Sequence, residues 1–318
     1  MDRFEPPTYT AATRPGIEED IIKILGASGS GYKNYVTTLG DIHDGLAIDL
    51  SQFNSIDTTA ETVAVGAGVK IDDIIGHIYS AGILLQTGNA FGPGVIGVTL
   101  GGGVGRLTGV YGLMIDDLAS QDSSSNFLGK SVARANFGII TSAPCNLHPL
   151  SNDGNIFTAD LIFPANMTSD FFKTVESLNG NMPAEMSGIA TIIYDNSTNQ
   201  TQLMTNWVYV GTEGGARTAL APIFDFDPPY SSVSVIPWNL LINSTFNGFG
   251  TTVCQEGFIR DMYSANLKNY NASTFDTIID KMSGFFDEYP GGRSNALQYE
   301  IYPNQAMAVV SADETAWP

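Results

Sequence analysis

A glycine-rich stretch over residues 87–113 is the part of this sequence best suited to hold a ligand. Valine, isoleucine and leucine separate its glycines, whereas a flexible linker would be rich in serine. The glycines do not recur at every third position, which excludes a collagen-like segment. Gly103-Val104-Gly105 is followed by Arg106, and no buried strand and long helix frame it as a Rossmann finger requires. We therefore expect a loop whose backbone N–H groups hold a flat, phosphate-bearing ligand.

Tyrosines in the second half of the chain are candidates for proton transfer beside a reacting group. They lie in expected strands at Tyr194, Tyr209, Tyr299 and Tyr302. In QYEIY, strand alternation places Tyr299 and Ile301 on one face and Glu300 and Tyr302 on the other. The chain has 13 tyrosines, and most strand tyrosines are core or rim residues. Tyr299 and Tyr302 are therefore weak candidates, and the catalytic residue stays unknown.

The sequence contains no recognisable metal-ligand pattern. It has three histidines, and its two cysteines form no Cys-x-x-Cys motif. Asp116 and Asp117 are adjacent, and on an extended strand they would point to opposite faces. We therefore predict no metal site.

Four other side chains could be reactive or structural. Arg106 could balance a phosphate or pair with an acidic neighbour. His148, before Pro149, is expected to be structural. Cys145 and Cys254 could form a disulfide or stay separate as core thiols.

The composition is that of a globular protein: 318 residues, 43% hydrophobic and 15% charged. With 14 basic and 33 acidic residues, the net charge is −19. Such a surface repels phosphate backbones and anionic lipid, so we expect no nucleic-acid partner. No stretch approaches the roughly 20 uninterrupted apolar residues of a membrane span, so we expect no membrane partner either. The oligomeric state stays open.

Sequons for N-glycosylation begin at Asn166, Asn196, Asn199, Asn243 and Asn271. Their restriction to the second half suggests an exposed, glycosylated domain in a protein whose relatives pass through the secretory route. The first residues, however, lack the basic-then-apolar pattern of a secretory signal. The localisation therefore stays open, because the protein either remains inside the cell or has lost its signal.

The elements that would position these residues follow from hydrophobic periodicity. Residues 17–25 and 71–82 predict helices, and residues 45–53, 62–69 and 136–150 have strand character. After residue 150, strands and helices predict an α+β arrangement of a sheet covered by helices. The expected strands span 155–163, 188–195 and 201–211, and the expected helices span 169–180, 215–224 and 272–287. A domain boundary is predicted near Pro149.

Several motifs, taken in order, resemble the flavin domain of a known family. They are GLAIDLSQF, TVAVGAGV, the glycine-rich stretch, YGLMIDDL and NFGII, which fall within residues 9–150. The chain is similar to fungal FAD-linked oxidoreductases of the berberine-bridge-enzyme-like kind, in the p-cresol-methylhydroxylase/vanillyl-alcohol-oxidase fold group. The resemblance implies a two-domain α+β fold. Residues 1–150 would form the FAD-binding PCMH-type domain, and residues 151–318 the substrate-binding domain.

The resemblance also implies which residues contact FAD. Gly29-Ser30-Gly31-Tyr32 resembles the loop around the pyrophosphate, and the glycine-rich stretch resembles the loop beside the isoalloxazine and ribityl chain. Asp116 and the strand 136–140 resemble segments packed near the cofactor. The implied contact residues are Gly29, Ser30, Gly31, Tyr32, Thr87, Gly88, Asn89, Gly94, Gly97, Gly101, Gly102, Gly103, Gly105, Asp116, Asn136, Gly138, Ile139 and Ile140.

The sequence departs from the family pattern at both flavin-attachment positions. Ser30 replaces the usual histidine, and Ala90 replaces the cysteine of bicovalent members. FAD is therefore expected to bind noncovalently. Segments that the family has near residue 26 and between Leu118 and Asn126 are shortened, and the family's C-terminal segment would follow Pro318. A divergent or shortened gene and an error of the gene model both fit these gaps.

The implied activity is oxidation of a small organic substrate, plausibly a specialised metabolite. Hydride passes to the flavin, and O2 is the final acceptor. Two alternatives remain open: an inactive or binding-only member of the family, and a redox-neutral cyclase that uses the same pocket.

Overall fold

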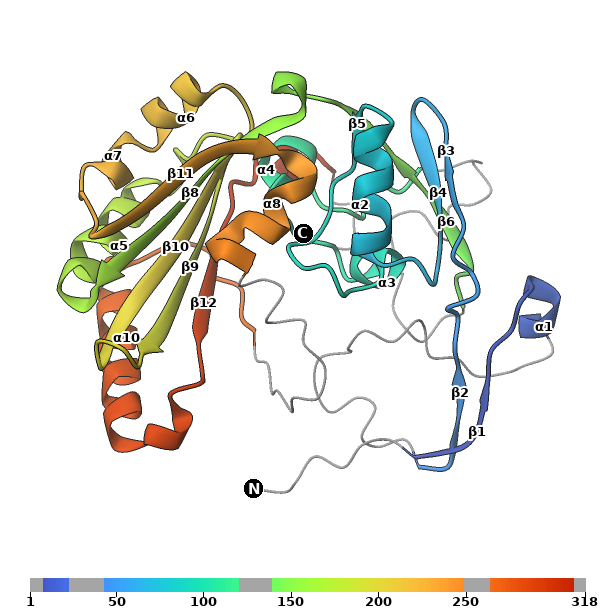
Figure 1. Cartoon of the computed structure of the whole chain (residues 1–318), viewed down its shortest axis with the longest axis horizontal. Coiled ribbons are helices and arrows are strands. Elements are labelled where there is room, and N and C mark those ends of the chain that lie inside the picture. The colour runs from blue at the N-terminus through green and yellow to red at the C-terminus, as the bar shows by residue number, and fades with distance from the viewer. Residues whose placement is uncertain (1–7, 23–42, 120–138, 249–263, 312–318) are drawn as a thin grey trace.

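The computed structural model describes residues 8–22, 43–119, 139–248 and 264–311. Two groups of elements lie side by side (Figure 1). One is a five-stranded sheet with its helices, and the other contains helix α2 (Ile71–Ser80) and three small sheets. This mixture of helices and largely antiparallel sheets agrees with the predicted α+β class.

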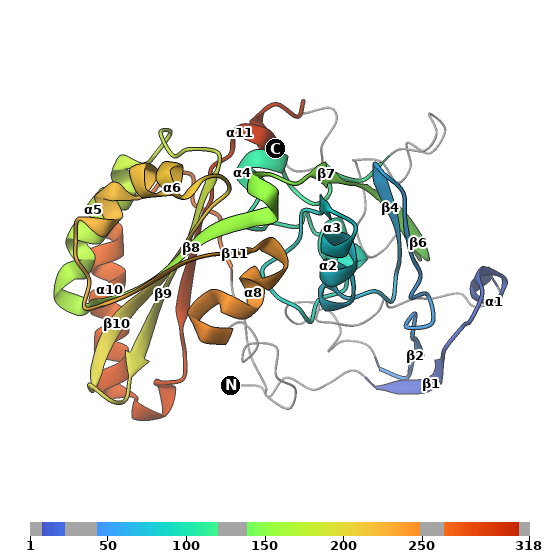
Figure 2. The ribbon, with the colours of Figure 1, turned by 45° about the horizontal axis from the view of Figure 1, so that its top comes forward.

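The five-stranded sheet is antiparallel throughout and has the order β11-β8-β10-β9-β12. Helices α5 (Thr168–Ser177) and α10 (Ala272–Glu288) cover one of its faces (Figure 2). The opposite face is turned toward the other group of elements. The strands are β8 (Asn155–Pro164), β9 (Met186–Asp195), β10 (Gln200–Tyr209), β11 (Tyr230–Pro237) and β12 (Leu297–Ile301).

An aromatic core fills the space between this sheet and its helices. The Phe172 and Phe275 rings stack with centroids 4.5 Å apart, which joins α5 to α10. Trp207 on β10 is fully buried, and its ring lies over Gly188 on β9. Because each large buried side chain contributes about 1.5–3 kcal/mol, this cluster is the principal apolar attachment of the two helices.

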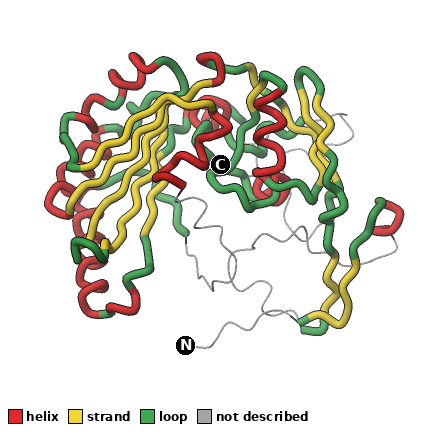
Figure 3. The backbone as a smooth tube through the Cα atoms, in the orientation of Figure 1, coloured by secondary structure: helices red, strands yellow, loops and turns green. Residues whose placement is uncertain are grey.

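The second group of elements is built around α2, whose Ile71, Ile74 and Ile78 are completely buried. The helix ends before Gly82, which has a φ of +76° and stops it, as the sequence predicted. Short strands and loops dominate this group (Figure 3). Its strands are β1 (Tyr9–Thr13), β2 (Gly45–Ile48), β3 (Ile56–Thr58), β4 (Thr62–Gly66), β5 (Ile83–Leu84), β6 (Ser142–Asn146) and β7 (His148–Pro149).

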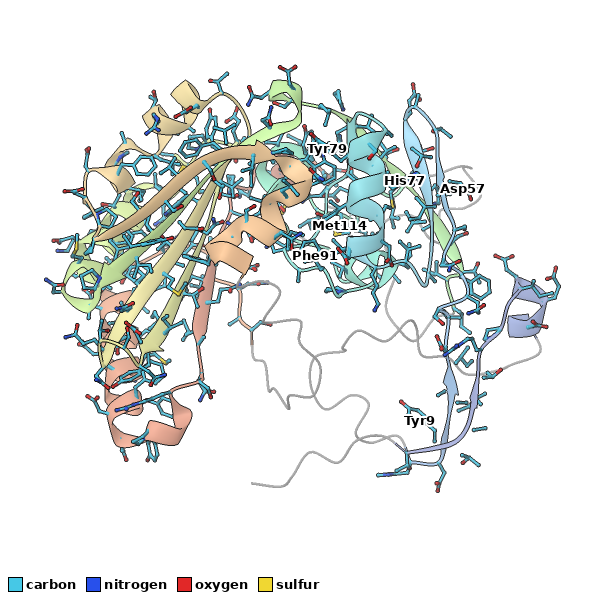
Figure 4. The ribbon with its side chains drawn as sticks, in the orientation of Figure 1. Tyr9, Asp57, His77, Tyr79, Phe91 and Met114 are labelled. Atoms are coloured by element: carbon cyan, nitrogen blue, oxygen red, sulfur yellow. The ribbon has the colours of Figure 1, made fainter. Side chains whose placement is uncertain are left out.

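Side chains on the two sides of α2 have different neighbours (Figure 4). His77 lies on the side of β3, is exposed, and hydrogen-bonds the Thr58 hydroxyl at 3.1 Å. Phe91 and Met114, from the glycine-rich stretch and the residues after it, lie on the side turned toward the large sheet.

Several predicted elements need correction. The glycine-rich stretch is not one loop, because it contains helices α3 (Val95–Leu100) and α4 (Thr108–Tyr111). The strand expected to reach residue 53 ends at Ile48. The helix expected over 215–224 is two helices, α6 (Glu213–Ala219) and α7 (Ala221–Phe224), with Pro222 in the first turn of the second. Proline is accepted in a first turn but disrupts a helix interior.

The sequence analysis did not predict strands β1, β3, β5 and β11 or helices α8 (Leu241–Ser244) and α11 (Gln305–Ala308). Strand β11 has mostly exposed residues, so it lacks the apolar run that marked the other strands. Helices α1 (Glu18–Ile22), α8 and α11 are four or five residues long, and of these only α1 falls within an expected helix. No helix within the described ranges has the length and apolarity needed to cross a bilayer.

The two groups share packed side chains. Ile156, Val208 and Trp238, all after residue 150, are buried in the same apolar cluster as α2. Gly109 on α4 approaches Pro303 so closely that a Cβ there would lie 2.3 Å from its ring. The domain division at residue 150 remains a prediction.

The contact between Gly188 and Trp207 yields a stability test. An added Cβ at Gly188 would lie 2.6 Å from the Trp207 ring, so Gly188→Ala should lower the free energy of unfolding by about 1–3 kcal/mol. Gly284 on α10 has no atom within 4 Å of such a Cβ, and Gly284→Ala should raise it by about 0.5–1 kcal/mol. Urea unfolding measures both, and equal effects would contradict the packing described.

Candidate active site

A polar patch occupies the sheet face opposite the helices. Thr158 and Asp160 on β8 and Asn206 on β10 project from this face, because their apolar neighbours Phe157, Ala159 and Trp207 point into the helix-covered core. Asn206 pairs with Asp160 across the two strands. These side chains are buried, so each of them needs a hydrogen-bond partner.

Arg106 of the glycine-rich stretch reaches this patch. Its Nη1 donates to the Asn206 carbonyl at 3.2 Å, and its Nη2 donates to Asn206 Oδ1. Asn206 Nδ2 in turn donates to Thr158 Oγ1 at 3.0 Å and to Asp160 Oδ1 at 2.7 Å. Asp160 Oδ2 accepts the backbone N–H of Phe246 at 2.9 Å. One hydrogen-bonded chain therefore connects the glycine-rich stretch to strands β10 and β8.

Burial shifts the pKa values of the two ionisable groups in this chain of hydrogen bonds. Loss of solvation lowers the pKa of Arg106, and the nearby Tyr302, Glu300 and Asp160 oppose that shift. Loss of solvation also raises the pKa of Asp160, opposed by the hydrogen bonds from Asn206 and Phe246 and by the charge of Arg106. The direct partner of Arg106 is a neutral amide, so it forms no direct pair with an acidic side chain of the described residues, and its possible role toward a phosphate remains a prediction.

Glu300 and Tyr302 stand beside Arg106. Asn89 Nδ2 donates to the Tyr302 hydroxyl at 2.5 Å, which joins the glycine-rich stretch to the end of β12. The Glu300 side chain reaches solvent but is closely surrounded by protein, and this loss of solvation raises its pKa. Arg106, Asn89 and Gln298 oppose that rise. Desolvation and then the charge of Glu300 raise the pKa of Tyr302, which therefore stays a neutral phenol.

The glycine-rich stretch also presents unused hydrogen-bonding groups. Among the described residues, the backbone N–H groups of Gly88, Asn89 and Ala90 have no partner, nor does the buried Asn89 Oδ1. Glycine is required at Gly105, because a Cβ there would lie 1.9 Å from the Thr87 carbonyl oxygen. Gly103 has a φ of +74°, which also favours glycine. Such donors fit the carbonyl and phosphate oxygens of a flavin dinucleotide.

A small cavity lies between the stretch and the residues after β11. The cavity has a volume of about 20 Å³ and is lined by Thr87, Asn89, Arg106 and Trp238 with several apolar side chains. The buried Trp238 Nε1 has no hydrogen-bond partner among the described residues. A cavity of this size accommodates about one water molecule.

The structure brings some predicted cofactor residues together and separates others. Thr87, Gly88, Asn89 and Gly105 lie beside Arg106, as described above. Gly94 precedes α3, Gly97 is exposed within it, and Gly101 follows it, before Gly102 with its φ of +101°.

The remaining predicted residues lie elsewhere. Asp116 accepts the N–H of Leu113 at 2.9 Å, which closes a turn. Ile139 packs beside Ile48 and Leu50, and Ile140 contacts the α2 cluster. Outside the described residues are Gly29, Ser30, Gly31, Tyr32, Asn136 and Gly138.

The two candidate tyrosines occupy opposite faces of the sheet, as strand alternation predicted. The Tyr299 ring packs edge-on against Phe275 with centroids 4.6 Å apart, inside the helix-covered core. Tyr302 lies on the side of Asn89 and Arg106. Of the two, Tyr302 is therefore the one placed beside the polar patch.

His148 lies in a packed pair with Asp117, and its structural role remains a prediction. Its Nε2 lies 2.9 Å from Asp117 Oδ2, and its ring stacks on Tyr111 with centroids 4.0 Å apart. Asp116 and Asp117 lie in a turn, which corrects the expected strand. Cys145 is a free, buried thiol whose pKa is raised by desolvation to about 12, and Cys254 lies outside the described residues. No group of three possible metal ligands occurs in the described ranges.

Asn206 and Asp160 were missed by the sequence analysis. Both stand in strands that were predicted correctly, in NIFTADLIF and TQLMTNWVYV. Their signal was the polar residue at alternate positions of an otherwise apolar strand, which marks a second buried face. Sequence alone does not show that Arg106, a hundred residues away, completes that face.

Comparisons with known proteins agree with this architecture. Residues 24–122 match the family described as FAD binding domain. An FAD-linked oxidoreductase of Aspergillus ruber is 36% identical over 342 residues, covering 99% of this chain and 69% of the relative.

Two solved structures share the fold. A BBE-like protein of Arabidopsis thaliana has a TM-score of 0.76 at 16% identity, covering 100% of this chain and 71% of its own. Glucooligosaccharide oxidase of Acremonium strictum, whose FAD is described as 6-S-cysteinyl and 8α-N1-histidyl, has a TM-score of 0.69 at 18% identity, covering 97% and 72%. Taken with the sequence relatives, they show that this chain belongs to the FAD-linked oxidoreductases and has the berberine-bridge-enzyme-like, PCMH-type fold.

Proposed function

We propose that this protein oxidises a small organic substrate between the glycine-rich stretch and the polar face of the five-stranded sheet. The observation that carries the proposal is the juxtaposition, on one side of that sheet, of Arg106, Glu300 and Tyr302 with the unpartnered N–H groups of residues 88–90. FAD, when bound, supplies the hydride acceptor, and O2 is the proposed final acceptor of the electrons. The substrate class that fits is one with a hydroxyl or phenol proton to lose.

FAD would be held by the backbone of the glycine-rich stretch. The N–H groups of Gly88, Asn89 and Ala90 are the donors that the described residues offer to its oxygens. The side chain of Ala90 has no atom able to form a bond to the flavin, and Cys145 is buried in the α2 cluster. We therefore propose noncovalent binding.

Glu300 is the proposed proton acceptor. A carboxylate whose pKa is raised toward the working pH is an effective general base. Arg106 would favour the anion that forms as the substrate hydroxyl loses its proton. Tyr302 is a neutral phenol held in place by its hydrogen bond with Asn89, and it would orient the substrate. These roles assign proton transfer to side chains from both groups of elements.

The flavin assignment has a direct test. Purified protein should be yellow, and acid precipitation should release the flavin into the supernatant, where its absorbance measures the FAD content. Protein that is colourless and takes up no added FAD would overturn the proposed oxidoreductase. Colour that stays with the precipitate would overturn only the noncovalent attachment.

The proton acceptor is tested with Glu300→Gln, which removes the titrating group at nearly constant volume. Because the carboxylate must be ionised, kcat/KM of the native enzyme should fall as the pH decreases through the raised pKa of Glu300. The variant should lose this acid limb and roughly 10²–10⁴-fold in kcat/KM. Oxidation rates measured across the pH range with a phenolic or alcoholic substrate panel give both values.

Glu213→Gln is the matched control, since Glu213 lies on the exposed helix α6, where it pairs with Arg217. It should leave the pH profile unchanged. If Glu300→Gln keeps the acid limb while retaining its FAD, another group is the proton acceptor.

A further inference from the structure

The chain of hydrogen bonds between Arg106 and Asp160 has an unusual order of charges. A buried guanidinium normally has a carboxylate as its direct partner. Here Arg106 forms no ion pair with any described residue, and the neutral Asn206 stands between it and Asp160. The carboxylate is thus one side chain farther away than a direct pair would place it.

Both polar atoms of the Asn206 side chain take part in this chain of hydrogen bonds. Its Nδ2 faces Thr158 and Asp160, and therefore its Oδ1 faces Arg106. Rotating the amide by half a turn would place an NH2 group against the guanidinium and an oxygen against the carboxylate. Both contacts would be repulsive, so the orientation is determined by its partners.

The positive charge of Arg106 also acts on titratable groups other than Asp160. The titratable groups near its guanidinium are Asp160 from β8 and Glu300 and Tyr302 from the end of β12. Tyr270 donates its hydroxyl to the Glu300 carbonyl at 2.7 Å and is also close to these groups. Arg106 and Asp160 are buried, and a buried charge acts more strongly on its neighbours than a charge in water does.

We propose that Asn206 is a positioning residue that acts as a neutral spacer: it fixes Arg106 while keeping Asp160 away from it, so that the guanidinium charge acts on Glu300 and Tyr302. This inference rests on the proposed function, because it assigns Asn206 a role in preparing the proton acceptor. A simply structural Asn206 would need its hydrogen bonds but not its neutrality.

Exchanging the side chains of Asn206 and Asp160 distinguishes a neutral spacer from a simply structural residue. In the double variant Asn206→Asp with Asp160→Asn, the net charge, the volume and the number of hydrogen-bonding groups are preserved. The amide at 160 can accept from the Phe246 N–H and donate to the carboxylate at 206, and the Thr158 hydroxyl can donate instead of accept. Only the position of the negative charge changes, because it moves into direct contact with Arg106.

The readout is the pKa of Glu300, followed by NMR of the full-length protein with ¹³C-labelled glutamate and assigned with Glu300→Gln. The double variant should shift this pKa upward. The carboxylate at position 206 would offset the positive charge of Arg106, which would then stabilise the Glu300 carboxylate less. The acid limb of kcat/KM should move upward with it. An unchanged pKa in a folded double variant would overturn the spacer.

A second variant keeps the inference testable if the double variant does not fold. Asp160→Asn alone removes the carboxylate and leaves Asn206 beside Arg106, so the pKa of Glu300 should move downward. A shift upward or no shift would contradict the proposal. Thr205→Val is the matched control, because Thr205 is a buried residue of the same strand whose side chain alternates to the other face.

The two proposals fail in different ways. If the protein binds no FAD or oxidises no substrate, the oxidoreductase proposal fails, while the NMR titration still decides whether Asn206 separates the two charges. If oxidation proceeds and the titration shows no shift, only the spacer fails.

Discussion

A guanidinium buried between two groups of elements is the constraint on which this structure depends. An unpaired buried charge costs several kcal/mol, so Arg106 requires hydrogen-bond acceptors from the sheet at the place where the glycine-rich stretch meets it. Asn206 provides two of them, through its backbone and its side chain. Asp160 then satisfies the amide and Phe246 satisfies the carboxylate. If the glycine-rich stretch moved away from the sheet, the Arg106 guanidinium and the Asn206 Oδ1 would lose these partners.

The large sheet can serve this interface because its two faces have different chemistry. Alternate residues of β8 and β10 send Phe157 and Trp207 into the aromatic core under α5 and α10. The intervening residues send Thr158, Asp160 and Asn206 to the opposite side. The apolar face holds the helices, and the polar face contacts the glycine-rich stretch through Arg106.

Glycines allow the backbones to approach closely enough for this contact. A side chain at Gly105 would collide with the Thr87 carbonyl, and one at Gly109 would collide with the backbone at Ala184. The first contact shapes the glycine-rich stretch, and the second places α4 against the residues before β9 and, through Pro303, against those after β12. Glycines of one stretch therefore permit two close contacts, one within the stretch and one between the two groups of elements.

Hydrophobic periodicity by itself determined the long elements α2, α5, α10, β8, β9 and β10, and ordered motifs determined the flavin-type family. These are local properties, because the apolar positions of a helix or strand of ten residues indicate which of its faces is buried. Strand β11 and the four-residue helices α8 and α11 escaped prediction because they contain too few apolar residues to show a period. The partners of Arg106 and the placement of Tyr302 beside Asn89 and Arg106 were decided only by the tertiary structure. They depend on which residues face one another across a hundred or more positions, and nothing in a local pattern specifies that pairing.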